Sequence, residues 1–348
     1  MPENPSGQPL IALEGVHRTF RQGRVRVPVL QDINLAVHEN EIVCLVGESG
    51  CGKTTTGRIM VDLLGPSSGK VLYKGRPLSA LRGKDKAEQR RALQIIHQDP
   101  FASLNPSHTV GQILSFPLKR HRMVQGRGGV RRRIWELLTL VDLTPPGDLV
   151  NKYPHQLSGG QRQRVSIARA LTVQPKLIVA DEAVSMVDVS IRVSLLKMLH
   201  GLRDQLGVAI VFITHDLALA KYFAWEGRIA VMYLGRIVEI GPTPDVIANP
   251  AHPYTRALIS AIPEADPEVT RNKQRMVLRS EDIPRLTDIP PGCAFHPRCP
   301  FFVPGLCDAR VPPLERAEGF AQSVACLPLT EGLGLREHVP VEEPVVGS

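Results

Sequence analysis

The sequence predicts an α/β fold in which a mainly parallel sheet carries a phosphate-binding loop. Short, mostly apolar runs at residues 41–46, 176–180 and 208–214 are typical of strands buried on both faces. They lead directly into Gly47, Asp181 and His215. The first run is followed by the pattern G-x-x-x-x-G-K-T. Because ligands of open α/β sheets bind outside the carboxyl ends of the strands, we expect the functional site there.

Length and composition set limits on the class of protein. The chain has 348 residues, which predicts one large domain with an appendage. Hydrophobic residues make up 43% of it, enough for a core. No apolar run approaches the ~18 residues of a membrane helix, and residues 1–5 lack the features of a secretory signal. We therefore expect a cytoplasmic protein that can sit against a membrane.

The formal net charge of +8 is unevenly distributed. Between residues 117 and 135 the basic residues, with no acid among them, are Lys119, Arg120, Arg122, Arg127, Arg131, Arg132 and Arg133. Such a patch can face anionic lipid headgroups or an acidic partner, or it can be a solvated helix face. No recognition motif for nucleic acid accompanies the charge, so no nucleic-acid partner is expected.

The remaining elements follow along the chain. Residues 70–75 and 229–239 contain glycine turns and predict antiparallel strands. Residues from about 100 to 171 are expected to be mostly helical, and residues 132–141 have the spacing of an amphipathic helix. After residue 262, prolines multiply and regular periodicity fades, which predicts a domain boundary between residues 1–262 and 263–348. Residues 339–344 are expected to form a mobile tail.

The loop after the first strand has the composition of a phosphate cradle. Its glycines let backbone N–H groups point at phosphate oxygens, and the next helix adds positive potential at its N-terminus. Lys53 is expected to reach the β- and γ-phosphates, and Thr54 to coordinate Mg²⁺. The residues predicted to contact nucleotide here are Gly47, Glu48, Ser49, Gly50, Cys51, Gly52, Lys53, Thr54 and Thr55.

Two acids follow the second predicted strand. Asp181 can hold the magnesium shell through water. Glu182 can take a proton from the attacking water or orient it. Within the phosphate loop, Cys51 lies near a helix N-terminus, which predicts a lowered thiol pKa. We therefore expect a thiol-alkylating agent to block nucleotide binding and MgATP to protect the thiol. The alternative is that Cys51 is a small residue filling the loop.

A second glycine motif, Leu-Ser-Gly-Gly-Gln, occupies residues 157–161. Ser158 can cap the helix that runs on to Leu171. With Gly159 and Gly160 exposing backbone, that helix N-terminus is suited to an anion. Within one chain we expect it to lie too far from the phosphate loop to share a ligand.

With these motifs in this order, the chain resembles the ATPase subunit of an ATP-binding cassette (ABC) importer, and more closely the dipeptide/oligopeptide (peptide/nickel) subfamily. The resemblance spans about residues 10–327 and includes a Q-loop segment at residues 96–106. It implies a P-loop ABC nucleotide-binding domain with a RecA-like core, an antiparallel β subdomain and a helical subdomain at about residues 100–171. A small irregular, cysteine-containing C-terminal extension would follow.

The resemblance also implies roles for single residues. Gln98 would touch magnesium and the attacking water, and His215 would be the switch histidine that contacts the γ-phosphate. Asp188 falls on the D-loop position. Phe20 lies where the family stacks an aromatic on adenine, although it could also be a core aromatic. The residues that would contact a γ-phosphate held by an opposite subunit are Ser158, Gly159, Gly160 and Gln161.

One stretch departs from the family pattern. After Glu182 the family usually has Pro-Thr-Ser-Ala-Leu-Asp or Pro-Val-Ser-Ala-Leu-Asp, whereas residues 183–188 are Ala-Val-Ser-Met-Val-Asp. Loss of the proline removes a backbone restraint beside the catalytic acid. Hydrolysis is still expected because the catalytic groups are present.

Four of the six cysteines crowd the last sixty or so residues, with the spacing C-x5-C-x7-C-x18-C. Four thiolates can hold a [4Fe–4S] cluster or a zinc ion, or they can be free or packed thiols. The spacing lacks the C-x-x-C pairs of common zinc ribbons. The segment also resembles the C-terminal extension of peptide-importer ATPases, some of which hold an iron–sulfur cluster, so the cluster is favoured. The four are Cys293, Cys299, Cys307 and Cys326.

The preferred interpretation is an ATP-hydrolysing translocase subunit of a bacterial importer of di- or oligopeptides, on the cytoplasmic face of the inner membrane. Two cassettes would close around two MgATP, and hydrolysis at Glu182 would let them reopen. The expected partners are a second ATPase chain, two permease subunits and, indirectly, an extracytoplasmic solute-binding protein. The alternatives are a soluble ABC ATPase acting on ribosomes or DNA, and a non-hydrolysing regulatory subunit.

Overall fold

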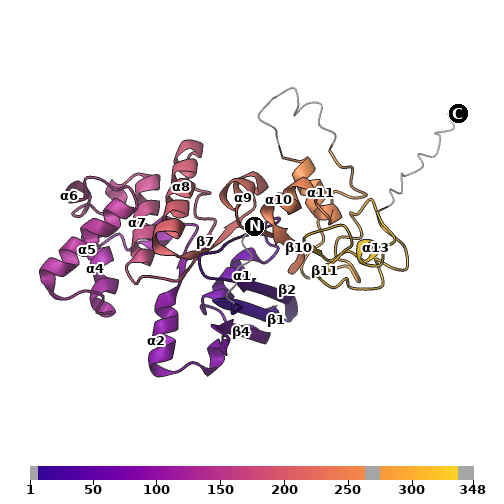
Figure 1. Ribbon diagram of the computed structural model, residues 1–348, viewed down its shortest axis with the longest axis horizontal. Coiled ribbons are helices and arrows are strands. Elements are labelled where there is room, and N and C mark those ends of the chain that lie inside the picture. The colour runs from indigo at the N-terminus through magenta and orange to yellow at the C-terminus, as the bar shows by residue number, and fades with distance from the viewer. Residues whose placement is uncertain (1–6, 263–274, 336–348) are drawn as a thin grey trace.

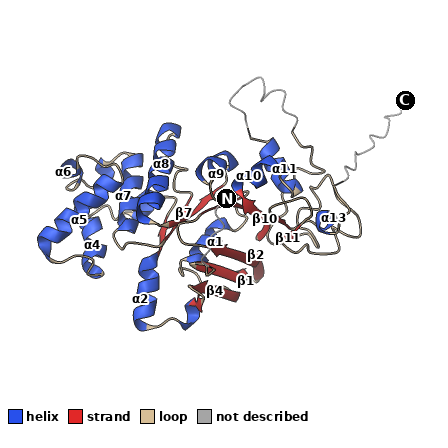
Figure 2. Cartoon of the chain, in the orientation of Figure 1, coloured by secondary structure: helices blue, strands red, loops and turns tan. Residues whose placement is uncertain are grey.

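The computed structural model describes residues 7–262 and 275–335. In Figure 1 a group of helices lies at one end, the strands occupy the centre, and an irregular segment closes the other end. Figure 2 shows how little regular structure that last segment holds. The tail expected at residues 339–344 lies outside the described residues.

The larger sheet carries the functional edge. Its strand order is β11-β12-β10-β9-β3-β8-β7-β6, and the run from β9 to β6 is parallel. β3, β7 and β8 are buried throughout, which confirms the three predicted buried strands. The strands are β3 (Ile42–Val46), β6 (Leu93–Ile96), β7 (Leu177–Asp181), β8 (Ala209–Thr214), β9 (Arg228–Tyr233), β10 (Arg236–Pro242), β11 (Glu315–Arg316) and β12 (Ser323–Val324).

A smaller antiparallel sheet lies beside it, in the order β2-β1-β4-β5. It contains β1 (Ile11–Gln22), β2 (Val25–Val37), β4 (Ser68–Tyr73) and β5 (Arg76–Pro77). Both predicted antiparallel segments are confirmed: residues 70–75 include most of β4, and residues 229–239 form the β9–β10 hairpin. That hairpin turns at Gly235, where an added Cβ would lie 2.5 Å from the Val29 carbonyl oxygen.

The helices cover the large sheet and form the lobe drawn in magenta in Figure 1. The predicted amphipathic helix at residues 132–141 is the second half of α5, which buries Ile134, Leu137 and Leu138. The long helices are α1 (Lys53–Met60), α2 (Gly83–Ala92), α4 (Val110–Arg120), α5 (Gly126–Leu140), α7 (Gly159–Leu171), α8 (Val189–Leu206) and α11 (Pro253–Ser260). Shorter ones are α3 (Pro100–Ser103), α6 (Pro146–Leu149), α9 (Leu217–Phe223), α10 (Thr243–Ala248), α13 (Leu327–Thr330) and the 3₁₀ turns η1 (Leu78–Ala80) and η2 (Pro154–Gln156). None of the helices in the described part of the chain has the length and apolarity to cross a membrane.

The strands of the large sheet separate two cores. Side chains of β3 alternate between them, as the two-residue period of a strand requires. Ile42, Cys44 and Val46 belong to the core on the helical side, whereas Val43 and Leu45 pack in the core that includes the antiparallel sheet. Because both faces of β3 are packed, the loop that follows it starts from a fixed position.

The irregular segment at residues 275–335 is attached to the edge of the large sheet. β12 pairs with β10, and a small buried cluster contains Ala251, Val324 and Cys326. The fully buried carboxylate of Glu239 accepts hydrogen bonds from the backbone N–H groups of Ala251 (2.8 Å) and His252 (2.9 Å). It also accepts one from the Gln322 side-chain amide at 3.0 Å. This carboxylate therefore ties β10, the start of α11 and the irregular segment together.

Candidate functional site

The phosphate loop runs from β3 into α1, in the predicted strand–loop–helix order. Lys53 is 5% exposed, and its Nζ donates to the carbonyl oxygens of Gly47 (2.7 Å) and Glu48 (2.9 Å). At Gly47 an added Cβ would lie 2.1 Å from the Met232 carbonyl oxygen, so the close packing of the loop on β9 requires glycine. The structure thus holds one ammonium group inside a glycine-rich turn at the N-terminus of a helix.

Thr54, in the first turn of α1, and Asp181, the last residue of β7, meet beside this loop. The Thr54 hydroxyl donates to Asp181 Oδ1 at 2.8 Å. Burial raises the pKa of the Asp181 carboxyl, and the hydrogen bond from Thr54 opposes that shift. Hydroxyl and carboxylate oxygens are the ligands that Mg²⁺ prefers. These two predicted magnesium ligands are adjacent, whereas the third, Gln98, forms its hydrogen bond with Glu182.

Gln98, Glu182 and His215 meet at the carboxyl edge of the sheet. Gln98 Nε2 donates to Glu182 Oε2 at 2.9 Å, and His215 Nδ1 lies 3.1 Å from Glu182 Oε1. They follow β6, β7 and β8, so the parallel strand order brings together residues 117 positions apart. The His215 side chain is 54% exposed, which leaves it accessible to a ligand. The three residues predicted for catalysis therefore form one hydrogen-bonded group.

The Leu-Ser-Gly-Gly-Gln motif forms the N-terminus of α7. Ser158 Oγ accepts from the Gln161 backbone N–H at 3.2 Å, and Gln161 Oε1 accepts from the Ser158 N–H at 3.0 Å. The predicted cap is confirmed in this reciprocal form. Among the described residues, no hydrogen bond joins this motif to the phosphate loop. Asp188 stands at the N-cap position of α8 without a side-chain capping bond.

Phe20 is near the end of β1, where it pairs with Val27 of β2. Its ring is half-buried, and the Arg18 guanidinium lies 4.5 Å from the ring centre. It is not among the buried core residues, so the interpretation as a core aromatic is not supported. A partly open aromatic face is what stacking on a base requires.

The pKa predicted for Cys51 is wrong. The residue is 3% exposed, and burial raises the pKa of its thiol. The Lys53 charge acts in the opposite direction but is the smaller effect. Desolvation of a thiolate outweighs the nearby ammonium because Cys51 is packed inside the loop. Cys51 is therefore a small residue that fills the loop, and we do not expect it to react readily.

The four cysteines of the irregular segment line one small cavity together with His252, Phe295 and Phe301. All four are free thiols. Burial raises the pKa of Cys293 to about 11 and that of Cys326 to about 12, and it raises the pKa of Cys299 and Cys307 as well. Over residues 7–262 and 275–335, no group of three or more His, Cys, Asp or Glu side chains is placed to hold a metal ion. The expected [4Fe–4S] cluster, and the zinc alternative, are therefore not supported.

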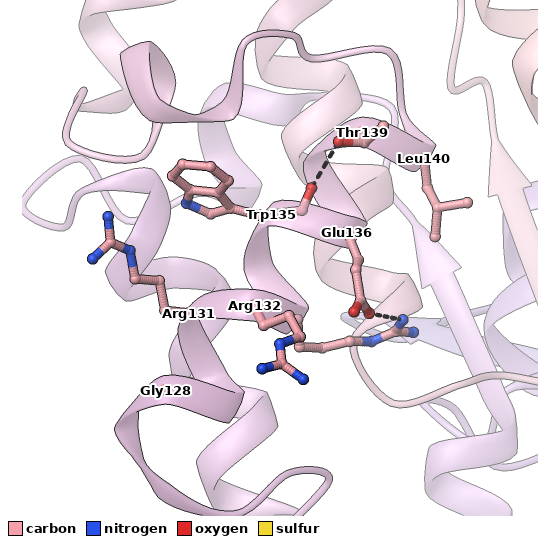
Figure 3. A pocket seen from close by; sticks show the side chains of 8 residues that line it. Gly128, Arg131, Arg132, Trp135, Glu136, Thr139 and Leu140 are labelled. Carbon is pink, nitrogen blue, oxygen red and sulfur yellow. Dashed lines mark hydrogen bonds and ion pairs between the residues drawn. The ribbon is translucent and has the colours of Figure 1, made fainter.

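The basic segment spans the end of α4, the turn that follows it and the first half of α5, and most of its charged side chains are exposed. Figure 3 shows Arg131, Arg132 and Trp135 projecting from α5, where they line a shallow groove. Trp135 is 40% exposed, and the Arg131 guanidinium lies 5.5 Å from its ring. Arg133 pairs with Glu136 at 2.9 Å, so part of the charge is balanced within the helix.

Two residues that the sequence patterns missed also contact the phosphate loop. The Glu48 backbone N–H donates to the Tyr254 hydroxyl at 3.0 Å. Arg298 pairs with the Glu48 carboxylate at 3.0 Å. Tyr254 follows the pair His252-Pro253 and Arg298 precedes Cys299, but no local pattern indicates that either residue reaches the loop.

Two family descriptions match the sequence. "ABC transporter" matches residues 30–185, and "Oligopeptide/dipeptide transporter, C-terminal region" matches residues 238–307. The chain is 44% identical over 294 residues to the probable peptide ABC transporter ATP-binding protein y4tS of Sinorhizobium fredii, covering 84% of this chain and 81% of that protein. It is 42% identical over 308 residues to the oligopeptide transport ATP-binding protein OppF of Salmonella typhimurium, covering 88% and 90%.

Solved structures of cassettes resemble the fold. The dimeric post-hydrolysis state of the ATP-binding cassette MJ0796, bound to ADP and Pi, matches with a TM-score of 0.60 and 29% identity over 67% of this chain and 98% of that one. The cbiO1 protein of Clostridium perfringens, part of the ABC transporter complex cbiONQ, matches with a TM-score of 0.61 and 28% identity. That match covers 70% of this chain and 92% of cbiO1.

Proposed function

The chain belongs to the ABC transporter family, and from that premise we propose that it is the ATP-hydrolysing motor subunit of a bacterial importer of di- or oligopeptides. The P-loop nucleotide-binding fold and the ABC-type ATPase class follow from the family. One observation carries the proposal of an active motor: Glu182 is bonded to both Gln98 and His215 beside the phosphate loop. Peptides are the proposed cargo because the matched relatives are named for peptide transport and the C-terminal region matches that subfamily.

The proposed nucleotide complex assigns each group a task. Lys53 pairs with the β- and γ-phosphates inside the loop formed by residues 47–52. Thr55, in the first turn of α1, is a further contact of the nucleotide. Thr54 and Asp181 would hold Mg²⁺, with Gln98 as a further ligand, and the bound ion would supply positive charge against the phosphates. Phe20 stacks on adenine.

Hydrolysis in this proposal depends on Glu182. Its carboxylate orients and deprotonates the attacking water, while His215 contacts the γ-phosphate from the exposed side. The departure at residues 183–188 leaves Glu182 in hydrogen-bonding contact with both partners, which favours hydrolysis over a regulatory role. The C-terminal region match favours transport over a soluble ABC ATPase acting on ribosomes or DNA.

The site of one chain is completed by a second cassette in this proposal. The capped N-terminus of α7, with Ser158, Gly159, Gly160 and Gln161, is suited to a γ-phosphate held by the partner, and Asp188 lies at the same interface. The MJ0796 cassette was solved as a dimer. We propose a heterodimer with a second ATPase chain, bound to two permease subunits at the cytoplasmic face of the membrane and served by a solute-binding protein. Residues 1–262 form the cassette, with the helical subdomain at about 100–171, and residues 263–348 form the extension.

We also keep the [4Fe–4S] cluster as a proposal for the four cysteines, ahead of zinc. The support is that all four line one cavity and that the spacing resembles peptide-importer extensions. Their raised pKa values mean that ligation has to remove protons from buried thiols. Anaerobic purification with iron, sulfide and zinc analysis decides the matter. Iron with equimolar sulfide supports the cluster, and zinc supports the alternative. If neither metal is found, the four cysteines are packed thiols.

The proposed motor is tested in its complex. The chain is purified from detergent-solubilised membranes, the co-purifying chains are identified, and ATPase activity is measured in proteoliposomes with and without peptides and binding protein. We expect a second cassette, two multispanning permeases and peptide-stimulated turnover that Lys53→Ala abolishes. Native turnover in Lys53→Ala, or the absence of any permease, contradicts the proposal.

A further inference from the structure

A buried arginine of the irregular segment reaches the phosphate loop. Arg298 Nη1 lies 3.0 Å from Glu48 Oε1 and 3.2 Å from Glu48 Oε2, although the two residues are 250 positions apart. The Arg298 side chain is 7% exposed and that of Glu48 is 23% exposed. The pair therefore links the C-terminal segment to the loop that is proposed to hold the triphosphate.

The pair sits beside a cluster of aromatic rings from three parts of the chain. Tyr233 of β9 and Tyr254 of α11 have ring centres 4.7 Å apart, and Phe295 packs at 5.3 Å and 5.5 Å from them. The Arg298 guanidinium lies 5.8 Å from the Tyr233 ring and 5.7 Å from the Phe295 ring. Rings exclude water, so the attraction between the two charges is stronger than at an open surface. Removing one partner leaves the other charge uncompensated.

Glu48 is held at three points, and each comes from a different element. Its carboxylate meets Arg298, its backbone N–H donates to the Tyr254 hydroxyl at 3.0 Å, and its carbonyl oxygen accepts from Lys53 Nζ at 2.9 Å. Glu48 follows Gly47, the first residue of the loop. A shift of Glu48 would therefore move both the loop backbone and the lysine that the phosphates need.

The charge of Glu48 is the second part of the argument. A carboxylate beside a phosphate cradle repels a triphosphate unless a cation neutralises it. Lys53 does not serve that purpose, because its Nζ is bonded to loop carbonyl oxygens and its proposed task is to pair with phosphate. In the described part of the chain, Arg298 is the cation that pairs with the Glu48 carboxylate. Nη1 of the Arg298 guanidinium lies at nearly equal distances from the two carboxylate oxygens of Glu48.

We propose that Arg298 is a positioning residue of the nucleotide site: it neutralises and fixes Glu48, so that the affinity of the phosphate loop for ATP depends on the C-terminal segment. Arg298 acts through Glu48 and does not touch the nucleotide. This inference rests on the proposed ATP site at Lys53.

The first measurement is equilibrium binding of MgATP to the full-length chain, with a fluorescent ATP analogue as the probe. Arg298→Met keeps volume in the aromatic cluster but removes the charge, and we expect affinity about tenfold weaker or more, which corresponds to ~1.4 kcal/mol. In the assembled complex KM for ATP should rise by a similar factor while kcat changes less. Arg310→Ala is the matched control, because it removes an exposed arginine of the same segment, paired with Glu331. It should bind like the native chain.

The second measurement separates neutralisation from simple packing. In the double variant Glu48→Gln/Arg298→Met no unpaired charge remains, so affinity should recover most of the loss seen in Arg298→Met. Double-variant affinity as weak as that of Arg298→Met, or native affinity in Arg298→Met, overturns the proposal. If Arg298→Met does not fold, Arg298→Lys replaces it. Lysine keeps the charge but not the planar guanidinium, so about threefold weakening is expected. Native affinity in a folded Lys variant overturns the part of the proposal in which Arg298 fixes the position of Glu48.

A Lys53→Ala chain, measured in the same assay, separates this inference from the function on which it rests. Loss of binding in Lys53→Ala with native binding in Arg298→Met rejects the role of Arg298 alone. Native binding in Lys53→Ala rejects the proposed nucleotide site itself.

Discussion

The carboxyl edge of the parallel strands and the junction between α11 and the C-terminal segment are both rich in polar groups, but they use them differently. At the edge, Glu182 is bonded to Gln98 and to His215, and the His215 side chain is 54% exposed. At the junction, Glu239 is fully buried and holds two backbone N–H groups and the Gln322 amide. His252 beside it is 1% exposed.

The comparison teaches which polar cluster can act on a ligand. Groups at the edge keep open faces toward the space beyond the strand ends, where ligands of α/β sheets bind. Groups at the junction are hydrogen-bonded to other groups of the protein, so they stabilise the attachment of the C-terminal segment. Substitutions at the edge should change turnover and binding, whereas substitutions of Glu239, His252 or Gln322 should change stability.

Glu182→Gln is the change with the largest expected effect. The amide cannot take a proton from water, so steady-state ATP turnover in the assembled complex should fall by about 10²–10⁴-fold. MgATP binding should remain within a few-fold of native, because the phosphate loop is untouched. Phosphate release and equilibrium binding measure the two quantities, and undiminished turnover would remove Glu182 from the mechanism.

The junction should show its effect in the dependence of stability on pH. Burial lowers the pKa of His252 from 6.5 to about 3, so the folded protein holds this imidazole neutral. The unfolded chain binds the proton first, and stability is therefore lost as pH falls from about 6.5 toward about 3. A complete shift of this size corresponds to roughly 5 kcal/mol.

His252→Asn tests this expectation. Asparagine can still accept the N–H of Tyr254, which now donates to His252 Nδ1 at 3.0 Å. Denaturant unfolding of both proteins between neutral and acidic pH should show a smaller loss in the variant. If both proteins lose the same free energy of unfolding on acidification, other groups govern acid sensitivity. As a control, ATP binding of the variant at neutral pH should stay near native.

Phe20→Leu should have the smallest effect of the three. Stacking of a base on an aromatic contributes about 1–3 kcal/mol. Because leucine keeps an apolar contact, the loss should lie near the lower end of that range, and ATP affinity should fall about five- to tenfold. Turnover at saturating ATP should be unchanged. Competition by tripolyphosphate, which has no base, provides the control, since its affinity should not change. Equal weakening for both ligands would indicate a general disturbance of the β1–β2 hairpin.

Much of the catalytic edge could be predicted from the sequence because its determinants are local. The apolar runs place β3, β7 and β8 in the interior, the glycines require the loop after β3, and Ser158 with Gln161 specifies a helix start. Parallel strands end on one edge, which is why the sequence predicts a functional site beyond the strands that lead into Gly47, Asp181 and His215. Backbone geometry and side-chain periodicity are encoded over a few residues, which is the range a motif covers.

Only the tertiary structure decided which groups lose water and which partners meet across the chain. Cys51 has the loop position of a reactive thiol, but packing buries it and reverses the expected shift of its pKa. The four clustered cysteines are spread over 34 residues of sequence, and only the packing of the C-terminal segment brings them to one cavity as buried thiols with raised pKa values. Arg298 and Glu48 become partners across 250 positions because β9, α11 and the C-terminal segment pack around them. Desolvation and long-range pairing depend on everything that surrounds a residue, and a short stretch of sequence does not contain that information.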